Sequence, residues 1–299
     1  MRNPVVPPSV GVIGLGAMGS AMAANLVASQ TVREVWLHSR RAVSAEALVA
    51  SGGRWCATAA EIASRAEIVV VALPTLADLE ELLASDRGML AAPGRAVRSI
   101  VLTSTCPAQG VRELGQRLRD DHGIDLVDAP VSGGVEGARA ATLSIMVGHD
   151  GPLPSPVAQV LGVLGRVEEL GPVGAGQVAK ACNQLIVAST ALALAEACVL
   201  ASRSGIMLER LLPVLAGGYA GSALLDAKSP KLISEDYSPD GRAAYMLKDL
   251  RFASEAAVAS GTRTPLLDVA LEEFGVLVQA GLGEQDLAVV RRHVEARAR

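Results

Sequence analysis

One lysine of this chain lies in an apolar segment, where a role as an ordinary surface charge does not account for it. Only four of the 27 basic residues are lysine, and none of them precedes Lys180. Lys180 lies in the apolar segment Val178-Ala179-Lys180-Ala181-Cys182-Asn183. A desolvated ammonium, unlike a guanidinium, loses its proton readily, so it can donate and accept a proton near neutral pH. We predict that Lys180 is a general acid/base; the alternative is a lysine at a helix start whose amine extends into solvent.

Asn183 follows Lys180 by three positions. In a helix this spacing places the two side chains on one face. Asn183 is therefore a candidate to bind the same ligand as Lys180.

A glycine-rich sequence near the N-terminus has the pattern of a phosphate-binding turn. The pattern G-x-G-x-x-G is met by Gly14, Leu15, Gly16, Ala17, Met18 and Gly19. It follows the apolar run 10–13 and opens into a helical segment, which is the order that a dinucleotide-binding fold needs. We expect Gly14 to permit the turn, Gly16 to let a pyrophosphate approach, and Gly19 to let helix and strand pack closely. The alternative is a tight turn that binds nothing.

The residues after the second expected strand indicate which dinucleotide is bound. NAD-specific folds place an acidic residue there, where it binds the ribose 2′-hydroxyl. This chain has Ser39, Arg40 and Arg41 instead. Because the planar donor fork of arginine suits a phosphate group, we predict NADP(H) in preference to NAD(H). The alternative is that Arg40 and Arg41 only solvate a loop.

Apolar periodicity predicts the elements that must position these residues. Strands are predicted over 10–13, 35–37, 68–71, 100–102 and 126–127, with helical spacing in segments such as 20–29 and 76–84. This alternation is typical of βαβ units, hence of a parallel, Rossmann-type sheet. Two further candidate strands, 143–147 and 167–170, extend the sheet.

The strand signal ends at a cluster of glycine and proline, residues 171–176. The residues beyond it are typical of helices, and one long helix is expected over 177–204, about 28 residues or ~42 Å. We predict an α/β dinucleotide-binding domain over residues 1–170. An all-helical domain for substrate binding and oligomerisation, beginning with the long interdomain helix, is predicted over residues 171–299.

Composition excludes several classes of protein. Half of the residues are apolar and 19% are charged, so the disordered class does not fit, and 2% aromatic residues disfavour an aromatic-rich β-sandwich. A net charge of −4 provides no broad cationic surface for nucleic acid. The four cysteines form no C-x-x-C pair, and the first eight residues lack the apolar core of an export signal. We expect reduced thiols and a cytoplasmic location.

The most apolar segment, 185–201, imitates a membrane span. It contains Glu196 and is shorter than the ~20 apolar residues that a span requires, so we expect a buried helix and no membrane. Its aliphatic surface exceeds what one small helical domain should cover, which suggests a subunit interface in a homodimer or homotetramer. No metal site is expected, because His38, His122, His149 and His293 have no carboxylate or cysteine partners arranged as a ligand set, and we expect these histidines at the surface.

Four blocks of sequence together resemble the β-hydroxyacid dehydrogenases, the group containing 3-hydroxyisobutyrate dehydrogenase and tartronate semialdehyde reductase. The blocks are residues 11–26, the run Asp128-Ala129-Pro130-Val131-Ser132-Gly133-Gly134 with its continuation to Val147, residues 174–184, and Lys248-Asp249-Leu250. The resemblance covers nearly the whole chain. It implies hydride transfer between NADP(H) and a small β-hydroxy acid or its semialdehyde or keto form.

The resemblance also implies roles for individual residues. Ser132, Gly133 and Gly134 match the residues that bind the substrate carboxylate, Lys180 the general acid/base, and Asn183 the amide that orients the substrate. Lys248 matches a lysine near cofactor and substrate. Leu73, Pro74, Ser104 and Thr105 match the loops beside the nicotinamide.

This chain departs from the family pattern at two places. Thr103 stands where the family often has an acidic residue, followed after two positions by Cys106-Pro107, and residues 225–245 match only loosely. The substrate therefore stays open. Two alternatives share the architecture: an imine reductase, which typically lacks the lysine and the Ser-Gly-Gly run, and a non-catalytic NADP-binding module, which loses the lysine.

Overall fold

The computed structural model describes residues 7–297 of the chain. Most of the N-terminal segment that we expect not to be an export signal lies outside this range. By its internal contacts the chain forms two compact units, Met1–Lys180 and Ala181–Arg299. The domain boundary near residue 170 stays a prediction.

The first unit is built on a nine-stranded sheet with the order β3-β2-β1-β4-β5-β6-β8-β7, and β9 pairs with β8. The strands are β1 (Ser9–Ile13), β2 (Glu34–His38), β3 (Arg54–Trp55), β4 (Ile68–Val71), β5 (Ser99–Leu102), β6 (Asp125–Asp128), β7 (Val131–Ser132), β8 (Leu143–Gly148) and β9 (Gly165–Gly171). Each predicted strand is confirmed. β3 and β7 were not predicted, because two residues are too few to show an alternation.

The sheet is parallel from β3 through β6, but it is not parallel throughout. β8 runs antiparallel to both β6 and β7, whereas β9 is parallel to β8. The residues between β6 and β8 contain the short strand β7 and a seven-residue helix, α6 (Gly134–Ala140). They form no full crossover, so the chain returns beside β6 in the opposite direction.

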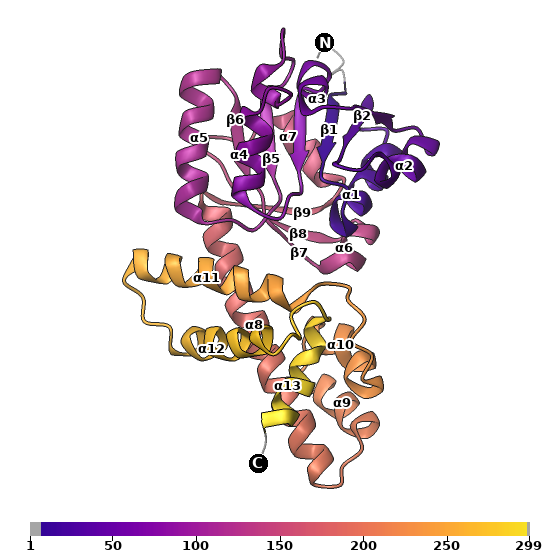
Figure 1. Cartoon of the computed structure of the whole chain (residues 1–299), viewed down its shortest axis with the longest axis vertical. Coiled ribbons are helices and arrows are strands. Elements are labelled where there is room, and N and C mark those ends of the chain that lie inside the picture. The colour runs from indigo at the N-terminus through magenta and orange to yellow at the C-terminus, as the bar shows by residue number, and fades with distance from the viewer. Residues whose placement is uncertain (1–6, 298–299) are drawn as a thin grey trace. The chain divides into compact units, whose positions relative to one another are not determined.

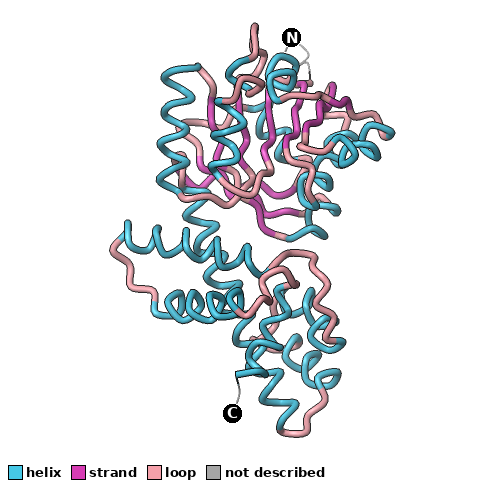
Figure 2. The backbone as a smooth tube through the Cα atoms, viewed as in Figure 1, coloured by secondary structure: helices cyan, strands magenta, loops and turns pink. Residues whose placement is uncertain are grey.

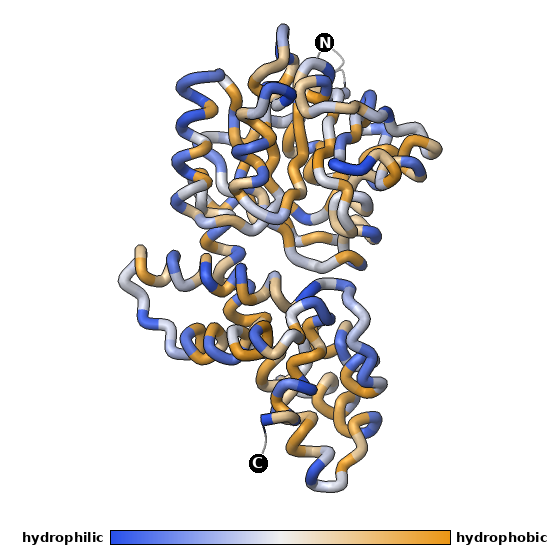
Figure 3. Tube along the Cα trace, in the orientation of Figure 1, coloured by the Kyte–Doolittle hydropathy of each residue, from blue (hydrophilic) through white to orange (hydrophobic). Residues whose placement is uncertain are grey.

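Helices cover both faces of this sheet (Figure 1). They are α1 (Ala17–Ala28), α2 (Glu46–Ala50), α3 (Ala59–Arg65), α4 (Leu76–Ala84), α5 (Ala108–His122), α6 and α7 (Ser155–Gly162). One hydrophobic cluster joins the sheet to α1, α6 and α7, and a second joins it to α3, α4 and α5. In Figure 3 the strands are mainly hydrophobic and the hydrophilic residues gather on helices such as α5. Both faces of each central strand are therefore buried, as the apolar runs predict.

The second unit is helical, and Figure 2 shows no strand in it over the described residues. Its helices are α8 (Ala175–Arg203), most of which belongs to this unit, α9 (Leu208–Ala216), α10 (Ala223–Ser234), α11 (Ala243–Ser260), α12 (Pro265–Gln279) and α13 (Val290–Arg297). α8 confirms the long helix predicted over 177–204. The predicted fold class, a Rossmann-type sheet followed by helices, is confirmed.

Within the described residues, α8 is the one helix whose length and hydropathy would allow a membrane span. A core helix of a water-soluble protein passes the same test. One side of α8, including Ala188, Leu192 and Ala195, packs with α11 and α12 in the core of the second unit. This burial accounts for much of the apolar character of the helix.

Two of the four histidines are buried, so the prediction that all lie at the surface is wrong for them. His149 is 8% exposed and its Nε2 lies 2.6 Å from Oδ2 of Asp125; His293 is 3% exposed and its Nε2 lies 2.8 Å from Oε2 of Glu273. Each carboxylate partner is at least 20 residues away from its histidine along the chain. Sequence positions three or four residues apart therefore do not reveal these pairs. Over residues 7–297, no three side chains of His, Cys, Asp or Glu gather closely enough to bind a metal ion.

Candidate active site

The three glycines of the G-x-G-x-x-G sequence have different surroundings. Gly14 has φ +94°, and a Cβ there would overlap the carbonyl oxygen of Ala72. A Cβ at Gly19 would overlap the carbonyl oxygen of Gly14. At Gly16, in contrast, a Cβ would find no heavy atom within 4 Å. Gly14 and Gly19 are therefore required by the turn and its packing, whereas Gly16 leaves open space in front of the backbone.

That open space adjoins the N-terminus of α1. Gly16 is the N-cap residue, no side chain caps the helix, and its first turn contains no acidic residue. The first backbone N–H groups of a helix attract an anion when no side chain occupies them. The residues present therefore fit the pyrophosphate of a dinucleotide.

The end of β2 lies beside this loop, because the N–H of Gly14 donates to the carbonyl of His38 at 3.1 Å. Ser39, which is half-buried, follows directly. Arg40 and Arg41 are exposed, and neither forms an ion pair with a carboxylate in the described part of the chain. Arg40 and Arg41 therefore follow directly in the chain on the strand end that bonds to the glycine loop.

The loops after β4 and β5 are joined to each other. The N–H of Leu73 donates to Oγ of Ser104 at 3.0 Å, and Oγ1 of Thr103 donates to the carbonyl of Val71 at 2.8 Å. Leu73-Pro74 and Ser104-Thr105 therefore meet at the carboxyl ends of neighbouring parallel strands. Ligands of doubly wound sheets bind at this edge. Thr103, at the position where the resemblance leads one to expect an acidic residue, is buried and serves to link the two strands.

The Ser132-Gly133-Gly134 sequence begins on β7 and continues into α6. Gly133 has φ +131° and Gly134 φ +65°, conformations that favour glycine, and a Cβ at Gly134 would meet no atom within 4 Å. Nδ2 of Asn25 on α1 donates to the carbonyl of Ala138 on α6 at 2.6 Å. This bond ties the helix that follows the glycine loop to the helix that follows Gly133.

Asp128 at the end of β6 binds the beginning of α8, a role that the sequence reading missed. Its Oδ2 accepts from the N–H groups of Gly174 and Gln177 at 3.0 and 3.1 Å, and its Oδ1 accepts from Nε2 of Gln177 at 2.7 Å. The side chain is fully buried. Burial raises the pKa of this carboxyl from 3.8 to about 6, although the hydrogen bonds from Gln177 and the backbone oppose the rise.

The raised pKa gives Asp128 an unusual pH dependence. Between pH 4 and 6 the folded protein binds a proton at Asp128 that the unfolded chain releases, so this group stabilises the fold more as pH falls. The rise to about 6 corresponds to about 3 kcal/mol. The variant Asp128→Asn lacks this titrating group, so we expect its free energy of unfolding to fall further below that of the wild type at pH 4 than at pH 7.5, by up to about 3 kcal/mol. Urea denaturation of both proteins at several pH values measures this, and a pH-independent difference would contradict it.

Lys180 lies on α8, three residues after Gln177, and is 8% exposed. It is thus buried, not extended into solvent as the alternative interpretation required. The network of Asp128 and Gln177 fixes the helical turn that precedes it. This arrangement places a buried amine on the element that the end of β6 binds directly.

In the second unit, Asn183 and Lys248 belong to one hydrogen-bonded group. Nδ2 of Asn183 donates to Oε1 of Gln184 at 2.9 Å, and Nε2 of Gln184 donates to Oδ2 of Asp249 at 2.6 Å. Nζ of Lys248 lies 3.2 Å from Oδ1 of Asp249 and 5.2 Å from the ring centroid of Phe252. The buried pair Gln184 and Asp249 therefore connects two predicted site residues. Asp249 lies within a block that carries the resemblance, but no role was assigned to it.

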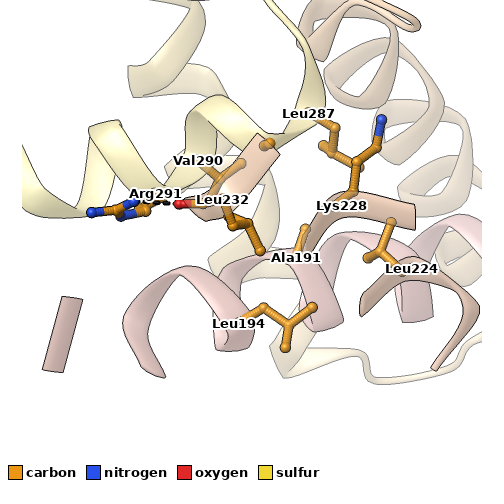
Figure 4. Close-up of a pocket in the computed structure, with 9 residues that line it drawn as sticks. Ala191, Leu194, Leu224, Lys228, Leu232, Leu287, Val290 and Arg291 are labelled. Atoms are coloured by element: carbon orange, nitrogen blue, oxygen red, sulfur yellow. Dashed lines mark hydrogen bonds between the residues drawn. The ribbon is translucent and has the colours of Figure 1, made fainter. Parts of the chain in front are cut away.

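A small, partly open pocket of the second unit is not this site (Figure 4). Its volume of about 10 Å³ is room for about one water molecule. It is lined by apolar side chains of α8, α10 and residues 287–290 together with Lys228 and Arg291, and it includes none of the predicted site residues.

Comparison with known proteins identifies the family. Residues 9–178 match the model of the NAD binding domain of 6-phosphogluconate dehydrogenase, and residues 174–294 match the NAD-binding domain of NADP-dependent 3-hydroxyisobutyrate dehydrogenase. The chain is 35% identical over 290 residues to the NAD-dependent L-serine dehydrogenase of Pseudomonas aeruginosa, over 94% of this chain and 95% of the relative. The chain belongs to the β-hydroxyacid dehydrogenase family.

Two solved structures illustrate the relationship of this chain to known proteins. The 3-hydroxyisobutyrate dehydrogenase of Mycobacterium tuberculosis with L-serine is 30% identical, with a TM-score of 0.80 over 98% of this chain and all of that one. An imine reductase of Myxococcus stipitatus shares the fold at 19% identity, with a TM-score of 0.63 over 97% of this chain and all of that one. Homologues of this chain are NAD(P)-dependent dehydrogenases of small hydroxy acids, which supports a nicotinamide cofactor.

Proposed function

We propose that this chain is an NADP(H)-dependent oxidoreductase that interconverts a small β-hydroxy acid and its semialdehyde or keto form, with Lys180 as general acid/base. The observation that carries the proposal is the burial of Lys180, at 8% exposure, on a helix whose start is bonded to the end of β6. A buried amine of this kind exchanges a proton near neutral pH. The family membership supports the same reaction.

In this mechanism the residues of the chain bind and orient the substrate and move one proton. The nicotinamide, when bound, supplies or accepts the hydride. Ser132 and the backbone N–H groups of Gly133 and Gly134 bind the substrate carboxylate, which fixes the reacting carbon. Lys180 donates a proton to the carbonyl oxygen in reduction and removes it in oxidation. Asn183 orients the substrate, and Lys248 contributes a positive charge.

The reaction is tested by following NADPH oxidation with a panel of small semialdehydes and keto acids, and NADP⁺ reduction with the matching hydroxy acids. A cyclic imine is included because imine reductases share the fold. Reduction of the carboxylate-bearing carbonyl compounds supports the proposal. Activity on the imine alone would indicate an imine reductase, and silence throughout with tight cofactor binding would indicate a binding module.

For the cofactor we propose a preference for NADPH that rests on Arg40 and Arg41. A charge-assisted hydrogen bond to a phosphate contributes about 1.5–3 kcal/mol, so removing Arg40 should weaken NADPH binding ~10–100-fold. NADH lacks the 2′-phosphate, so its affinity should stay within about threefold. Isothermal titration of Arg40→Ala and Arg41→Ala with both cofactors measures this, with Arg210→Ala, an exposed arginine of α9, as control. Equal NADH and NADPH affinity in the wild type would refute the preference.

We also propose that the chain forms a homodimer or homotetramer. Apolar side chains of α8 remain exposed, among them Ile186 at 65% and Leu200 at 69%. Exposed aliphatic surface on a long helix is typical of a subunit interface. Light scattering should give a mass of at least two chains, and Ile186→Asp should reduce it. A monomeric mass for the wild type would contradict the proposal.

A further inference from the structure

Gln177 is a buried glutamine that connects three separate segments of the first unit. It is 2% exposed and lies in the first turns of α8. Its Nε2 donates to the carbonyl of Ser104 at 3.0 Å as well as to Oδ1 of Asp128, and its Oε1 accepts from the N–H of Cys106 at 2.8 Å. The nitrogen and the oxygen of the Gln177 amide are therefore both hydrogen-bonded. Their partners in the loop after β5 are 71 and 73 residues away along the chain.

The loop that Gln177 binds is the one that reaches the cofactor side of the sheet. Ser104 offers its carbonyl to Gln177 and its hydroxyl to the N–H of Leu73, after β4. The bonds therefore run without interruption from the end of β4, through the loop after β5, to α8. Lys180 stands three residues beyond Gln177, or about 4.5 Å along the helix axis.

The start of α8 also packs too closely on the sheet to shift freely. A Cβ at Gly176 would overlap the carbonyl oxygen of Met146, and one at Gly148 would lie 2.7 Å from the carbonyl oxygen of Pro172. These main-chain contacts determine the distance between the start of α8 and the sheet. Gln177 bonds the helix to a specific loop as well, and so determines the orientation of its first turns relative to that loop.

We propose that Gln177, oriented by Asp128, is a positioning residue for Lys180. The inference rests on the proposed function, in which Lys180 transfers the proton. Without the Gln177 amide, the hydrogen bonds that hold the first turns of α8 to the loop after β5 are lost. The amine of Lys180 is then displaced from the reacting oxygen. Because a misplacement of about 1 Å can cost ~10²-fold in rate, the effect on hydride transfer should be large.

The test is a double-mutant cycle between Gln177→Met and Lys180→Ala in the full chain. Methionine keeps the length and unbranched shape of glutamine and removes its hydrogen bonds. Single-turnover hydride transfer and the Kd for NADPH are measured for both single variants, the double variant and Gln116→Met, a control at an exposed glutamine of α5. We expect Gln177→Met to slow hydride transfer ~10–100-fold with Kd within about threefold. In the Lys180→Ala background the same change should slow it less than about threefold, because the residue that it positions is gone.

The other outcomes separate the two claims. The positioning role would be overturned if the fold-losses in hydride-transfer rate of the two single variants multiply in the double variant. It would also be overturned if Gln177→Met weakens NADPH binding and leaves the rate unchanged. Both outcomes leave the proposed function standing. An unaffected Gln177→Met would overturn the positioning role too. A Lys180→Ala variant with unchanged hydride transfer would overturn the proposed function. If Gln177→Met does not fold, Asp128→Asn takes its place in the cycle, because it keeps the shape of the site and replaces one of the two carboxylate acceptors that bind Gln177 and Gly174 by an N–H donor.

Discussion

Replacing Lys180 by alanine should lower the rate of hydride transfer ~10²–10⁴-fold, the usual contribution of a positioned acid or base. The affinity for NADPH should remain nearly that of the wild type, because the glycine loop and Arg40 are untouched. Lys180→Arg should be similarly impaired, since a guanidinium does not give up its proton. Single-turnover absorbance measurements at saturating cofactor give the rate, and cofactor titration gives the affinity.

The pH profile distinguishes a proton-transfer role from a binding role. If Lys180 exchanges the proton, its removal should abolish one limb of the dependence of the hydride-transfer rate on pH. A Lys180→Ala enzyme with an unchanged profile and a raised KM would show that the amine only binds substrate. Unchanged single-turnover kinetics would remove Lys180 from the mechanism.

Gly19→Ala should destabilise the protein by about 3 kcal/mol or more, whereas Gly16→Ala should leave its stability within about 1 kcal/mol. The added methyl group at position 19 would overlap the carbonyl oxygen of Gly14, a backbone atom that no rotamer change can move. At position 16 the backbone is extended, with φ −76°, and the methyl group enters open space. Urea denaturation of both variants compares their free energies of unfolding.

Of the two variants, Gly16→Ala, which should remain stable, is the one that should lose affinity for the cofactor directly. The open space at Gly16 is where we expect the pyrophosphate to approach, so Gly16→Ala should weaken NADPH binding at least ~10-fold, or about 1.4 kcal/mol, in a well-folded protein. Wild-type affinity in Gly16→Ala would contradict a pyrophosphate at this loop. A Gly19→Ala protein as stable as the wild type would show that the turn adjusts.

Local sequence was sufficient to predict the elements that bear the candidate site. The buried strands are unbroken apolar runs, and the glycine loop needs particular backbone conformations within six residues, so both leave a local signature. Lys180 was found because lysine is rare in this chain and its neighbours are apolar. The family resemblance carried the assignment of Ser132, Asn183 and Lys248, which their residue types alone would not support.

The tertiary structure decided what the sequence pattern could not show. Asp128 and Gln177 are 49 residues apart, and each alone is an ordinary polar residue at the end of a strand or the start of a helix. The same holds for His149 with Asp125 and for Gln184 with Asp249. The antiparallel direction of β8 likewise depends on its pairing partners. Hydrophobic periodicity records which face of an element is buried, but a hydrogen bond between distant residues leaves no periodicity and exists only after the chain has folded.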